Sequence, residues 1–462
     1  MTLIKSISGI RGTIGGLPGD NLTPLDIVKF TSAYSQWLIK RKKSKEYTVV
    51  VGRDARVSGE MVRNIVAGTL QGMGIHVIDI GLASTPTTEV AVCKLSANGG
   101  IILTASHNPA QWNALKLLNE KGEFISAEDG KTILSLVENQ QFSFVNFDRL
   151  GSYSTNLGMD EVHIQEIINL PCVDIQAIEK VNFKVAIDCV NSVGGLVLPK
   201  LLNSLGVKKV IKIYCEPDGL FPHNPEPLPA NLTEISSVIK NVGADVGFVV
   251  DPDVDRLAII NEDGTMFGEE YTLVAVADYI LGLKGAGNTV SNLSSTMALK
   301  DITLNAGGNY YASAVGEVNV VEKMKETNAI IGGEGNGGVI FPDLHYGRDS
   351  LVGIALFLTY LAKTGVKCSQ LRAKYPNYVS SKNKIEIKGG VNVDIILQKI
   401  KNNYKGYDIN DIDGIKINFK NEWVHLRRSN TEPIIRIIAE SSDEKKAENL
   451  AEQIIAEIKS LM

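Results

Sequence analysis

The sequence of 462 residues has little of several features that mark specialised classes of protein. Its five cysteines are scattered without CxxC spacing, which argues against a disulfide framework or a zinc site and fits a reduced cytoplasm. No apolar run approaches the ~18–20 residues of a membrane helix. The first residues (MTLIKS) have no apolar signal core. We therefore expect a cytoplasmic protein with no membrane partner.

The sequence also has little excess of either positive or negative charge. The 47 Lys and Arg nearly balance the 52 Asp and Glu, which gives a formal net charge of -5. Nonspecific nucleic-acid binding needs a basic surface, so we expect no nucleic-acid partner. The hydrophobic share of 44% and the charged share of 21% are typical of soluble globular protein. At roughly 100–200 residues per domain, the length predicts about three domains.

Short apolar runs alternate with helical spacing through most of the chain. The expected strands include residues 47–52, 76–80 and 100–103, then 184–189, 210–214 and 245–250, and finally 329–332. Such alternation predicts βαβ units whose helices cover both sheet faces. After about residue 366 the pattern changes to alternating strands with two helices. The predicted fold is three similar mixed α/β units and a smaller C-terminal α+β unit.

The first loop that could carry chemistry is 104–109 (TASHNP). It directly follows an apolar strand, where open α/β sheets place ligands. Ser106 offers a hydroxyl on a tight turn, although Asn-Pro is also an ordinary turn signal. Lys116 interrupts the next apolar strand and either faces solvent or is held in a site. Partial burial would lower its pKa and suit it to proton transfer.

The second loop, 251–256, carries Asp251, Asp253 and Asp255 directly after a buried strand. Alternation by two could turn all three carboxylates to one side, where only a cation makes their charge tolerable. Oxygen ligands suit Mg²⁺, which favours phosphate chemistry. Arg256 could hold a phosphate through bidentate hydrogen bonds.

The acidic loop also has features of two other kinds of site. An EF-hand needs glycine at its sixth position, where Arg256 stands, and Pro252 also breaks that pattern. A phosphatase in which Asp251 is the nucleophile remains a competitor. That class would normally carry its Asp-x-Asp loop near the first strand of a domain, not in the middle of the chain.

Two further loops suit sugar and phosphate. Residues 332–338 (GGEGNGG) allow close approach of the backbone to a ligand, and Glu334 and Asn336 could bond sugar hydroxyls. Residues 427–433 (RRSNTEP), with Arg436 beyond, form an anion site or else an exposed basic turn. Arg11, near the N-terminus, belongs to a smaller candidate anion site of the same kind. If these loops meet in one cleft, they position a phosphosugar.

These motifs resemble those of the α-D-phosphohexomutase family along essentially the whole chain and in the same order. Residues 104–109 resemble its phosphoserine loop, 251–256 its metal loop, and 427–433 with Arg436 its phosphate-binding loop. Lys116 and Arg11 also fall at matching positions.

The resemblance implies four domains around a central cleft. They are expected at 1–152 (phosphoserine), 153–256 (metal), 257–366 (sugar) and 367–462 (C-terminal phosphate binding). Ser106 would be carried as phosphoserine and exchange its phosphoryl group with a hexose phosphate through a bisphosphorylated sugar. One Mg²⁺ per chain and an activating sugar 1,6-bisphosphate are implied, in a monomer or homodimer.

The same resemblance assigns the site residues. The catalytic group is Ser106, Lys116, Arg11 and His107. The metal ligands are Ser106, Asp251, Asp253 and Asp255. The substrate-binding group is Arg256, Glu317, Glu334, Asn336, Arg427, Ser429, Asn430, Thr431 and Arg436.

Departures from the family pattern leave the sugar open. The sugar loop lacks the histidine that many members have, residues 315–319 (VGEVN) replace a Gly-His pair, and residues 291–296 lack a lysine that some members use. The favoured hypothesis is a phosphoglucosamine mutase. The alternatives are a phosphoglucomutase/phosphomannomutase of broad specificity, a Mg²⁺-dependent sugar phosphatase with an Asp nucleophile, and a phosphosugar sensor without activity.

Overall fold

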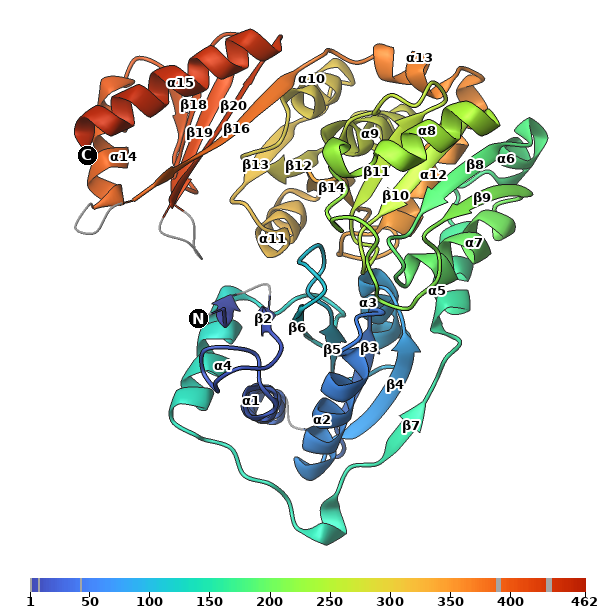
Figure 1. Ribbon diagram of the computed structural model, residues 1–462, viewed down its shortest axis with the longest axis vertical. Coiled ribbons are helices and arrows are strands. Elements are labelled where there is room, and N and C mark those ends of the chain that lie inside the picture. Colours follow the sequence, from blue (N-terminus) through green and yellow to red (C-terminus); the bar gives the residue numbers. More distant parts are fainter. Residues whose placement is uncertain (1, 7–8, 42–43, 388–391, 429–433) are drawn as a thin grey trace.

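The computed structural model describes residues 2–6, 9–41, 44–387, 392–428 and 434–462 (Figure 1). Four sheets follow one another along the chain, with seven, four, four and five strands. The first three contain parallel and antiparallel pairs, and the fourth is antiparallel throughout. The predicted fold class, three mixed α/β units and a smaller α+β unit, is confirmed.

The first unit is built on a sheet of order β1-β2-β6-β5-β3-β4-β7. Its strands are β1 (Ile4–Ser6), β2 (Gly9–Thr13), β3 (Thr48–Arg53), β4 (His76–Leu82), β5 (Gly99–Leu103), β6 (Trp112–Leu118) and β7 (Tyr153–Thr155). Its helices are α1 (Pro24–Arg41), α2 (Gly59–Gly72), α3 (Thr85–Lys94) and α4 (Ala127–Glu138), followed by the short turn η1 (Phe147–Arg149). Strand β5 and the middle of β3 consist of Val, Ile, Leu and Gly because helices cover both faces of the sheet.

The second unit has the strand order β11-β10-β8-β9. Its strands are β8 (Lys184–Asp188), β9 (Lys209–Ile213), β10 (Val246–Val250) and β11 (Leu257–Asn261). Its helices are α5 (Met159–Ile168), α6 (Ile175–Val181), α7 (Gly194–Ser204) and α8 (Thr233–Val242), with the turn η2 (Pro229–Asn231). Because β10 and β11 pair antiparallel, the acidic loop is the turn of a hairpin.

The third unit has the strand order β13-β12-β14-β15. Its strands are β12 (Thr289–Asn292), β13 (Tyr310–Ser313), β14 (Ile331–Glu334) and β15 (Gly338–Ile340). Its helices are α9 (Glu269–Lys284), α10 (Met297–Asn305), α11 (Glu317–Thr327) and α12 (Ser350–Thr364). The glycine-rich loop is again a hairpin turn, between β14 and β15. One hydrophobic core spans the second and third units, with Phe357 of α12 packed edge-to-face on both Phe248 and Phe267.

The fourth unit has its own core under one sheet face. Its strands are β16 (Val379–Glu386), β17 (Asp408–Asn410), β18 (Ile415–Asn418), β19 (Trp423–Arg428) and β20 (Ile434–Ser441). Its helices are α14 (Val393–Asn403) and α15 (Glu444–Leu461), and α13 (Cys368–Ala373) leads into it. Lys416 Nζ donates to the carbonyl of Leu293 at 2.8 Å, which ties this unit to the third.

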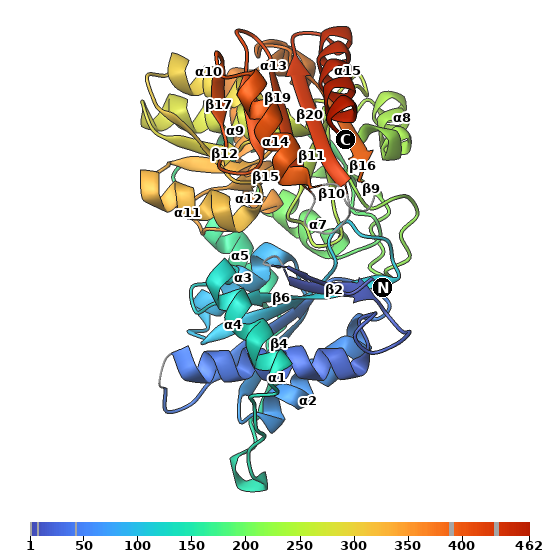
Figure 2. The same cartoon turned by 90° about the vertical axis from the view of Figure 1, so that its left-hand side faces the viewer.

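The units lie along an arc in chain order, so the first and fourth stand at its two ends (Figures 1 and 2). The predicted boundaries at 152, 256 and 366 remain predictions. The sheets themselves place β7 with the first unit and β11 with the second. Among the described helices, none combines the length and the apolar character needed to cross a membrane.

Candidate active site

The nucleophile candidate and the acidic loop meet at the junction of the first two units. Ser106 follows β5, and Asp251 follows β10. The Ser106 hydroxyl donates a hydrogen bond of 2.6 Å to Asp251 Oδ2. Both loops contain left-handed backbone outside glycine, at Ser106 (φ 50°) and Val254 (φ 64°). Such strained conformations persist where the surrounding structure fixes them, and they are common at functional sites.

Arg56, which sequence reasoning missed, fixes the Ser106 loop from below. Its side chain is buried and donates to the backbone carbonyls of Ser106 (2.5 Å) and Asn108 (2.6 Å). Its Nε bonds Asp54 Oδ2 at 3.0 Å, and Thr104 donates to the same oxygen at 2.6 Å. The guanidinium of Arg56 therefore fixes the backbone of the loop that carries Ser106.

The three aspartates form a buried acidic cluster that two cations partly neutralise. Lys116 Nζ lies 2.6 Å from Asp253 Oδ2 and 3.2 Å from Asp255 Oδ2. Arg348 donates to Asp255 Oδ2 at 2.7 Å. Thr85, at the start of α3, donates to Asp253 at 2.6 Å. These contacts explain why Lys116 interrupts an apolar strand: it points at the carboxylates of the next unit.

The donor set of this cluster fits a hard divalent cation. One carboxylate oxygen from each of Asp251, Asp253 and Asp255 lies within 4.8 Å of the others. The Oδ1 atoms of Asp253 and Asp255 are buried without a hydrogen-bond partner. A buried carboxylate oxygen left without a donor costs free energy, and all-oxygen donor sets suit Mg²⁺.

The pKa values in the cluster move in opposite directions. Burial, together with the charges of Asp253 and Asp255, raises the pKa of Asp251 well above its usual value. Burial alone would raise the pKa of Asp253, but the charge and hydrogen bond of Lys116 lower it below the usual value of an aspartate. The expectation that burial lowers the pKa of Lys116 is wrong. Burial does act in that direction, but the charges of Asp253 and Asp255 outweigh it and raise the pKa.

Arg348 joins the acidic loop to the sugar loop, and sequence reasoning also missed it. Its guanidinium donates to Glu317 Oε2 at 3.1 Å and to Glu334 Oε2 at 2.8 Å, besides its bond to Asp255. Asn292 donates to the other oxygen of Glu334 at 2.9 Å. The sequence did hold a signal for Arg348. These loops carry several carboxylates but lack the lysine and histidine of other family members, so another cation must balance the charge.

A buried cluster of Glu89, His163, His345 and Asp349, here called the histidine junction, holds the loop that carries Arg348. Asp349 Oδ2 lies 3.0 Å from His163 Nε2 and 3.3 Å from His345 Nε2, and its Oδ1 caps the first turn of α12. His345 Nδ1 lies 3.3 Å from Glu89 Oε2. Since Glu89 is on α3 and His163 on α5, the junction connects the first three units.

Three of the predicted residues, His107, Arg11 and Arg256, lie on or near the loop that carries Ser106. His107 Nδ1 lies 3.4 Å from Ser106 Oγ, and burial with the charge of Arg256 lowers the pKa of His107 to about 2. Arg11 donates to Asn108 Oδ1 at 3.5 Å, and burial with the charge of Arg256 lowers its pKa. Arg256 bonds Glu226 at 3.2 Å. His107 is therefore neutral, and its neighbours are cationic.

The remaining predicted residues lie in the third and fourth units. Asn336 caps its own loop by accepting from the Gly338 amide at 3.2 Å. Arg427 on β19 and Arg436 on β20 are directly opposite each other in the ladder. Asp413 Oδ2 lies 3.4 Å from Arg427 Nε and offsets part of this positive charge. Ser429, Asn430 and Thr431 lie outside the described residues.

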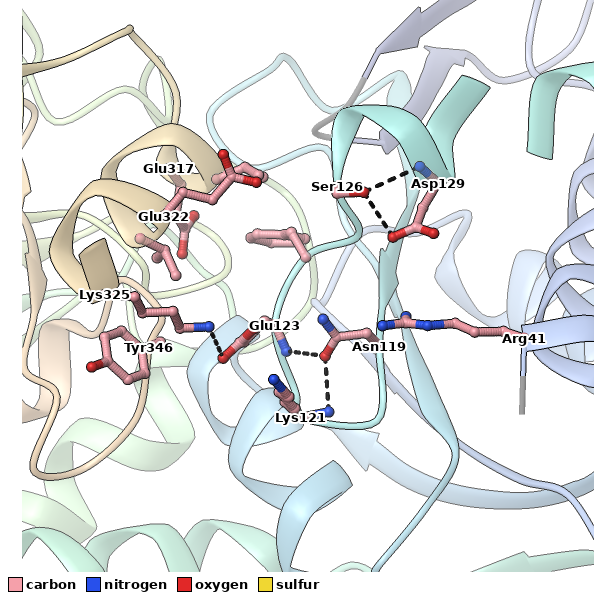
Figure 3. Close-up of a pocket in the computed structure, with 13 residues that line it drawn as sticks. Arg41, Asn119, Lys121, Glu123, Ser126, Asp129, Glu317, Glu322, Lys325 and Tyr346 are labelled. Atoms are coloured by element: carbon pink, nitrogen blue, oxygen red, sulfur yellow. Dashed lines mark hydrogen bonds and ion pairs between the residues drawn. The ribbon is translucent and has the colours of Figure 1, made fainter. Parts of the chain in front are cut away.

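A pocket of about 290 Å³ lies between the first and third units and shares Glu317 with the site (Figure 3). Its lining includes polar side chains from both units: Arg41, Asn119, Lys121, Glu123, Ser126, Asp129, Glu322, Lys325 and Tyr346. Lys325 spans it to Glu123 at 2.5 Å. The pocket contains neither Ser106 nor the acidic cluster, so it adjoins the candidate site without being its chemical centre.

Comparison with known proteins gives matches along nearly the whole chain. Sequence profiles of phosphoglucomutase/phosphomannomutase match in order: alpha/beta/alpha domain I at residues 3–144, domain II at 161–264, domain III at 268–378 and the C-terminal domain at 382–457. A phosphoglucomutase/phosphomannomutase of Thermococcus kodakarensis is 37% identical over 444 residues, which is 96% of both chains. A phosphoglucosamine/phosphogalactosamine mutase of Sulfurisphaera tokodaii is 34% identical and covers 96% of this chain and 97% of its own.

Solved structures agree on the fold. A phosphoglucomutase/phosphomannomutase family protein from Burkholderia thailandensis superimposes with a TM-score of 0.85 at 24% identity and covers 99% of this chain and 98% of its own. The pp63/parafusin phosphoglucomutase of Paramecium gives a TM-score of 0.78 at 16% identity, covering 99% and 94%.

Proposed function

Because the chain belongs to the phosphoglucomutase/phosphomannomutase family and is a phosphomutase of the isomerase class, we propose that it interconverts 6-phospho and 1-phospho hexoses through phosphoserine at Ser106. The preferred substrate in this proposal is glucosamine phosphate. The observation that carries the mechanism is the 2.6 Å contact between the Ser106 hydroxyl and Asp251. It puts a phosphoryl-carrying oxygen directly against a carboxylate cluster suited to a cation.

Each half-reaction exchanges one P–O bond for another. The bond between Ser106 Oγ and phosphorus breaks as a sugar hydroxyl oxygen bonds to the same phosphorus, and the hydroxyl proton leaves. Neutral His107, whose Nδ1 is 3.4 Å from Ser106 Oγ, is placed to hydrogen-bond that oxygen. Its pKa of about 2 makes it too weak a base to take the hydroxyl proton, which passes instead to an oxygen of the transferring phosphoryl group. The bisphosphorylated sugar then turns and returns its other phosphate to Ser106. Positioning and charge neutralisation do most of the work in such transfers.

The cations of the site have separate tasks in this proposal. Lys116 stays protonated because Asp253 and Asp255 raise its pKa, so it stabilises charge on the transferring group and does not act as a base. Arg11 and Arg256 add positive potential beside the Ser106 loop. Arg427, Arg436 and the loop with Ser429, Asn430 and Thr431 would hold the phosphate that is not reacting.

Asp251, Asp253, Asp255 and an oxygen on Ser106 would hold one Mg²⁺ per chain. When bound, the ion neutralises charge on the transferring phosphoryl group. This metal site is supported by the Oδ1 atoms of Asp253 and Asp255, which are buried and have no hydrogen-bond partner. A sugar 1,6-bisphosphate would act as activator by phosphorylating Ser106.

The sugar would lie against the third unit. Glu317, Glu334 and Asn336 are the candidate groups for its hydroxyl or amino substituents, and two of them are carboxylates fixed by Arg348. Arg348 supplies one positive charge against the two carboxylates, so the group keeps a net negative charge. This favours a substituent that can be cationic, which supports glucosamine phosphate. The name of the Thermococcus relative favours the alternative, a phosphoglucomutase/phosphomannomutase of broad specificity. The free cysteines are consistent with a cytoplasmic reaction.

Substitution of Ser106 tests the mechanism. Ser106→Ala is expected to abolish turnover and to carry no phosphate by intact-mass measurement after treatment with glucose 1,6-bisphosphate. Ser237→Ala, on α8, is the matched control and should behave as wild type. A phosphatase using Asp251 would keep releasing inorganic phosphate in Ser106→Ala. A sensor would bind phosphosugar with no turnover in either form.

A side-by-side comparison of rates tests the substrate. Glucosamine, glucose and mannose 6-phosphates are supplied with Mg²⁺ and the matching bisphosphate. We expect the highest kcat/KM for glucosamine phosphate. Similar values for glucose and mannose phosphates would instead support the broad-specificity alternative.

A further inference from the structure

Two of the five cysteines come together at the carboxyl end of the second unit's sheet. Cys189 directly follows β8, and Cys215 is the second residue after β9. These strands are parallel neighbours with Asp188 opposite Ile213, so their carboxyl ends lie together (Figure 1). The Cys189 amide and the Cys215 thiol both donate to the Ile213 carbonyl oxygen, each at 3.3 Å. The Cys215 sulfur therefore lies beside the Cys189 backbone.

The two thiols differ in exposure and in acidity. Cys189 is fully buried, whereas Cys215 is partly exposed. A hydrogen bond from the Cys189 thiol to Cys215 lowers the pKa of Cys215, while burial and the same bond raise the pKa of Cys189. The other cysteines, all in the described part of the chain, have pKa values raised by burial: Cys93, Cys172 and Cys368. Cys215 is thus the cysteine that most readily forms the reactive thiolate, with a second thiol hydrogen-bonded to it.

We propose that Cys189 and Cys215 form an oxidation site, at which a hydroperoxide joins the two sulfurs in a disulfide and lowers turnover. A partly exposed thiolate with a second cysteine beside it is the arrangement found at redox-sensing sites. In a reducing compartment such disulfides form transiently. The site is separate from the phosphate chemistry, since neither cysteine belongs to the proposed catalytic or metal-binding groups.

The oxidation takes two steps. The Cys215 thiolate attacks one peroxide oxygen and the O–O bond breaks, which leaves a sulfenic acid on Cys215; the departing oxygen takes the proton that the thiol lost. The Cys189 sulfur then attacks the Cys215 sulfur, the S–O bond breaks, and hydroxide leaves as water with the Cys189 proton. The two sulfurs together lose two electrons to the peroxide. A dithiol reverses the change by thiol–disulfide exchange.

Formation of the disulfide should move Cys215 rather than Cys189. A carbon added at Gly194 would lie 3.3 Å from the Cys189 sulfur, so this sulfur packs directly on the first turn of α7. Cys215 instead begins the segment 215–228, which contains no helix or strand. Because a covalent bond brings the sulfurs closer than a hydrogen bond does, the start of this segment must shift toward Cys189.

The segment 215–228 contacts two parts of the candidate active site. The Phe221 ring lies 5.0 Å from the guanidinium of Arg56, the residue that fixes the nucleophile's loop. Glu226 bonds Arg256 of the acidic loop at 3.2 Å. Misplacement of a catalytic group by ~1 Å can cost ~10²-fold in rate. Oxidation is therefore expected to lower kcat, an effect that rests on the proposed function, whereas the disulfide itself does not.

Peptide mapping without reductant tests the oxidation site on the full chain. After treatment with hydrogen peroxide and blocking of the remaining thiols, digestion is expected to release a cross-linked pair of peptides that carries Cys189 and Cys215. Dithiothreitol should separate the pair. Cys215→Ser and Cys189→Ala should give no such cross-link. Cys93→Ser, at the exposed cysteine of α3, is the matched control and should give it as wild type does.

Turnover measured on the same samples tests the effect on activity. Peroxide should lower kcat of wild type and of Cys93→Ser by up to about 10²-fold, and dithiothreitol should restore it. Cys215→Ser and Cys189→Ala should keep their kcat. The proposal is overturned if treated wild type lacks the cross-link, if the cross-link leaves kcat unchanged, or if Cys215→Ser loses kcat equally. Absence of turnover before any oxidation would count against the proposed function, and mapping would still decide whether the disulfide forms.

Discussion

Lys116 shows how one residue type changes its meaning between sequence and structure. In the sequence it is a lysine among apolar neighbours, and burial alone would favour its neutral form. In the folded chain two aspartates from the next unit reverse that preference. A single chain position cannot reveal this, because the partners are about 140 residues away.

Removal of this cation should damage both catalysis and stability. In Lys116→Met, Asp253 and Asp255 lose the ammonium between them, and we expect kcat to fall by about 10²-fold or more. Breaking a buried ion pair typically costs about 3–5 kcal/mol of unfolding free energy. Steady-state kinetics and urea unfolding measure the two effects. Lys131→Met, at an exposed lysine of α4, should change neither, and an unaltered kcat in Lys116→Met would contradict the assigned role.

Arg348 permits a test that separates charge from shape. Arg348→Lys keeps the positive charge but cannot bond Asp255, Glu317 and Glu334 at once, since only the guanidinium has donors in a planar fork. Losing one charge-assisted hydrogen bond is worth about 1.5–3 kcal/mol. We therefore expect KM for the sugar phosphate to rise roughly tenfold or more. Arg149→Lys on the surface is the control, and a KM equal to wild type would show that Arg348 does not shape the sugar site.

At the scale of elements, the loops that carry Ser106, the three aspartates and Asn336 are turns between antiparallel strands, and glycine makes one of these turns possible. Gly337, between β14 and β15, has φ +82°, and an added Cβ would lie 2.1 Å from the Leu257 carbonyl oxygen. The loop that carries Glu334 and Asn336 thus packs directly on β11 of the second unit.

Gly337→Ala should displace this loop. We expect lower stability and a higher KM, because both the backbone conformation and the contact with β11 are lost. Gly282→Ala is the matched control: it lies inside α9 with nothing within 4 Å of the added carbon. That change should leave KM alone and stabilise the protein by roughly 0.5–1 kcal/mol. Thermal unfolding and KM are measured on both variants. If Gly337→Ala has the same stability and KM as Gly282→Ala, Gly337 is not needed to position this loop.

The elements that sequence patterns predicted well are those with short-range signals. Buried strands such as β3, β5 and β10 consist mainly of apolar residues and glycine, and the loops after them carry polar residues of recognisable type. The pairing of β10 with β11, and of β14 with β15, was not predicted. Neither were Arg56 and Arg348, whose partners come from other segments. A pattern shows what a residue is next to in the chain, while these groups act on residues distant in sequence.

At the scale of the molecule, the histidine junction binds three units into one body. Burial alone would lower the pKa of His345, but its contacts with Asp349 and Glu89 raise it to about 10. Burial raises the pKa of Glu89 to about 8. Both groups keep their protons to higher pH in the folded chain than in the unfolded one.

The sign of the pH effect follows from that difference. A folded state that holds more protons loses stability as pH rises. The contribution of His345 is fully present below about 6.5, its ordinary value, and is lost as pH rises toward about 10. We expect the unfolding free energy to fall across this range by up to about 1.4 kcal/mol per pH unit per proton. Chemical unfolding at a series of pH values measures it. His345→Gln should flatten the curve, whereas His76→Gln, a histidine outside the junction, should not.

In the proposed function, the groups that transfer phosphate and the groups that hold the sugar lie on different units, and Arg348 bonds to both sets. Ser106, Lys116 and the aspartates belong to the first two sheets, while Glu317, Glu334 and Asn336 belong to the third. Because of this division, the residues that contact the sugar can change independently of the residues that transfer phosphate. Under the proposed function, we expect changes in the β14–β15 hairpin and in the turn before α11 to alter which hexose is accepted while Ser106 and the acidic cluster stay in place. Loop exchange between relatives is thus a direct route to new sugar preferences, provided that the arginine which both halves share is kept.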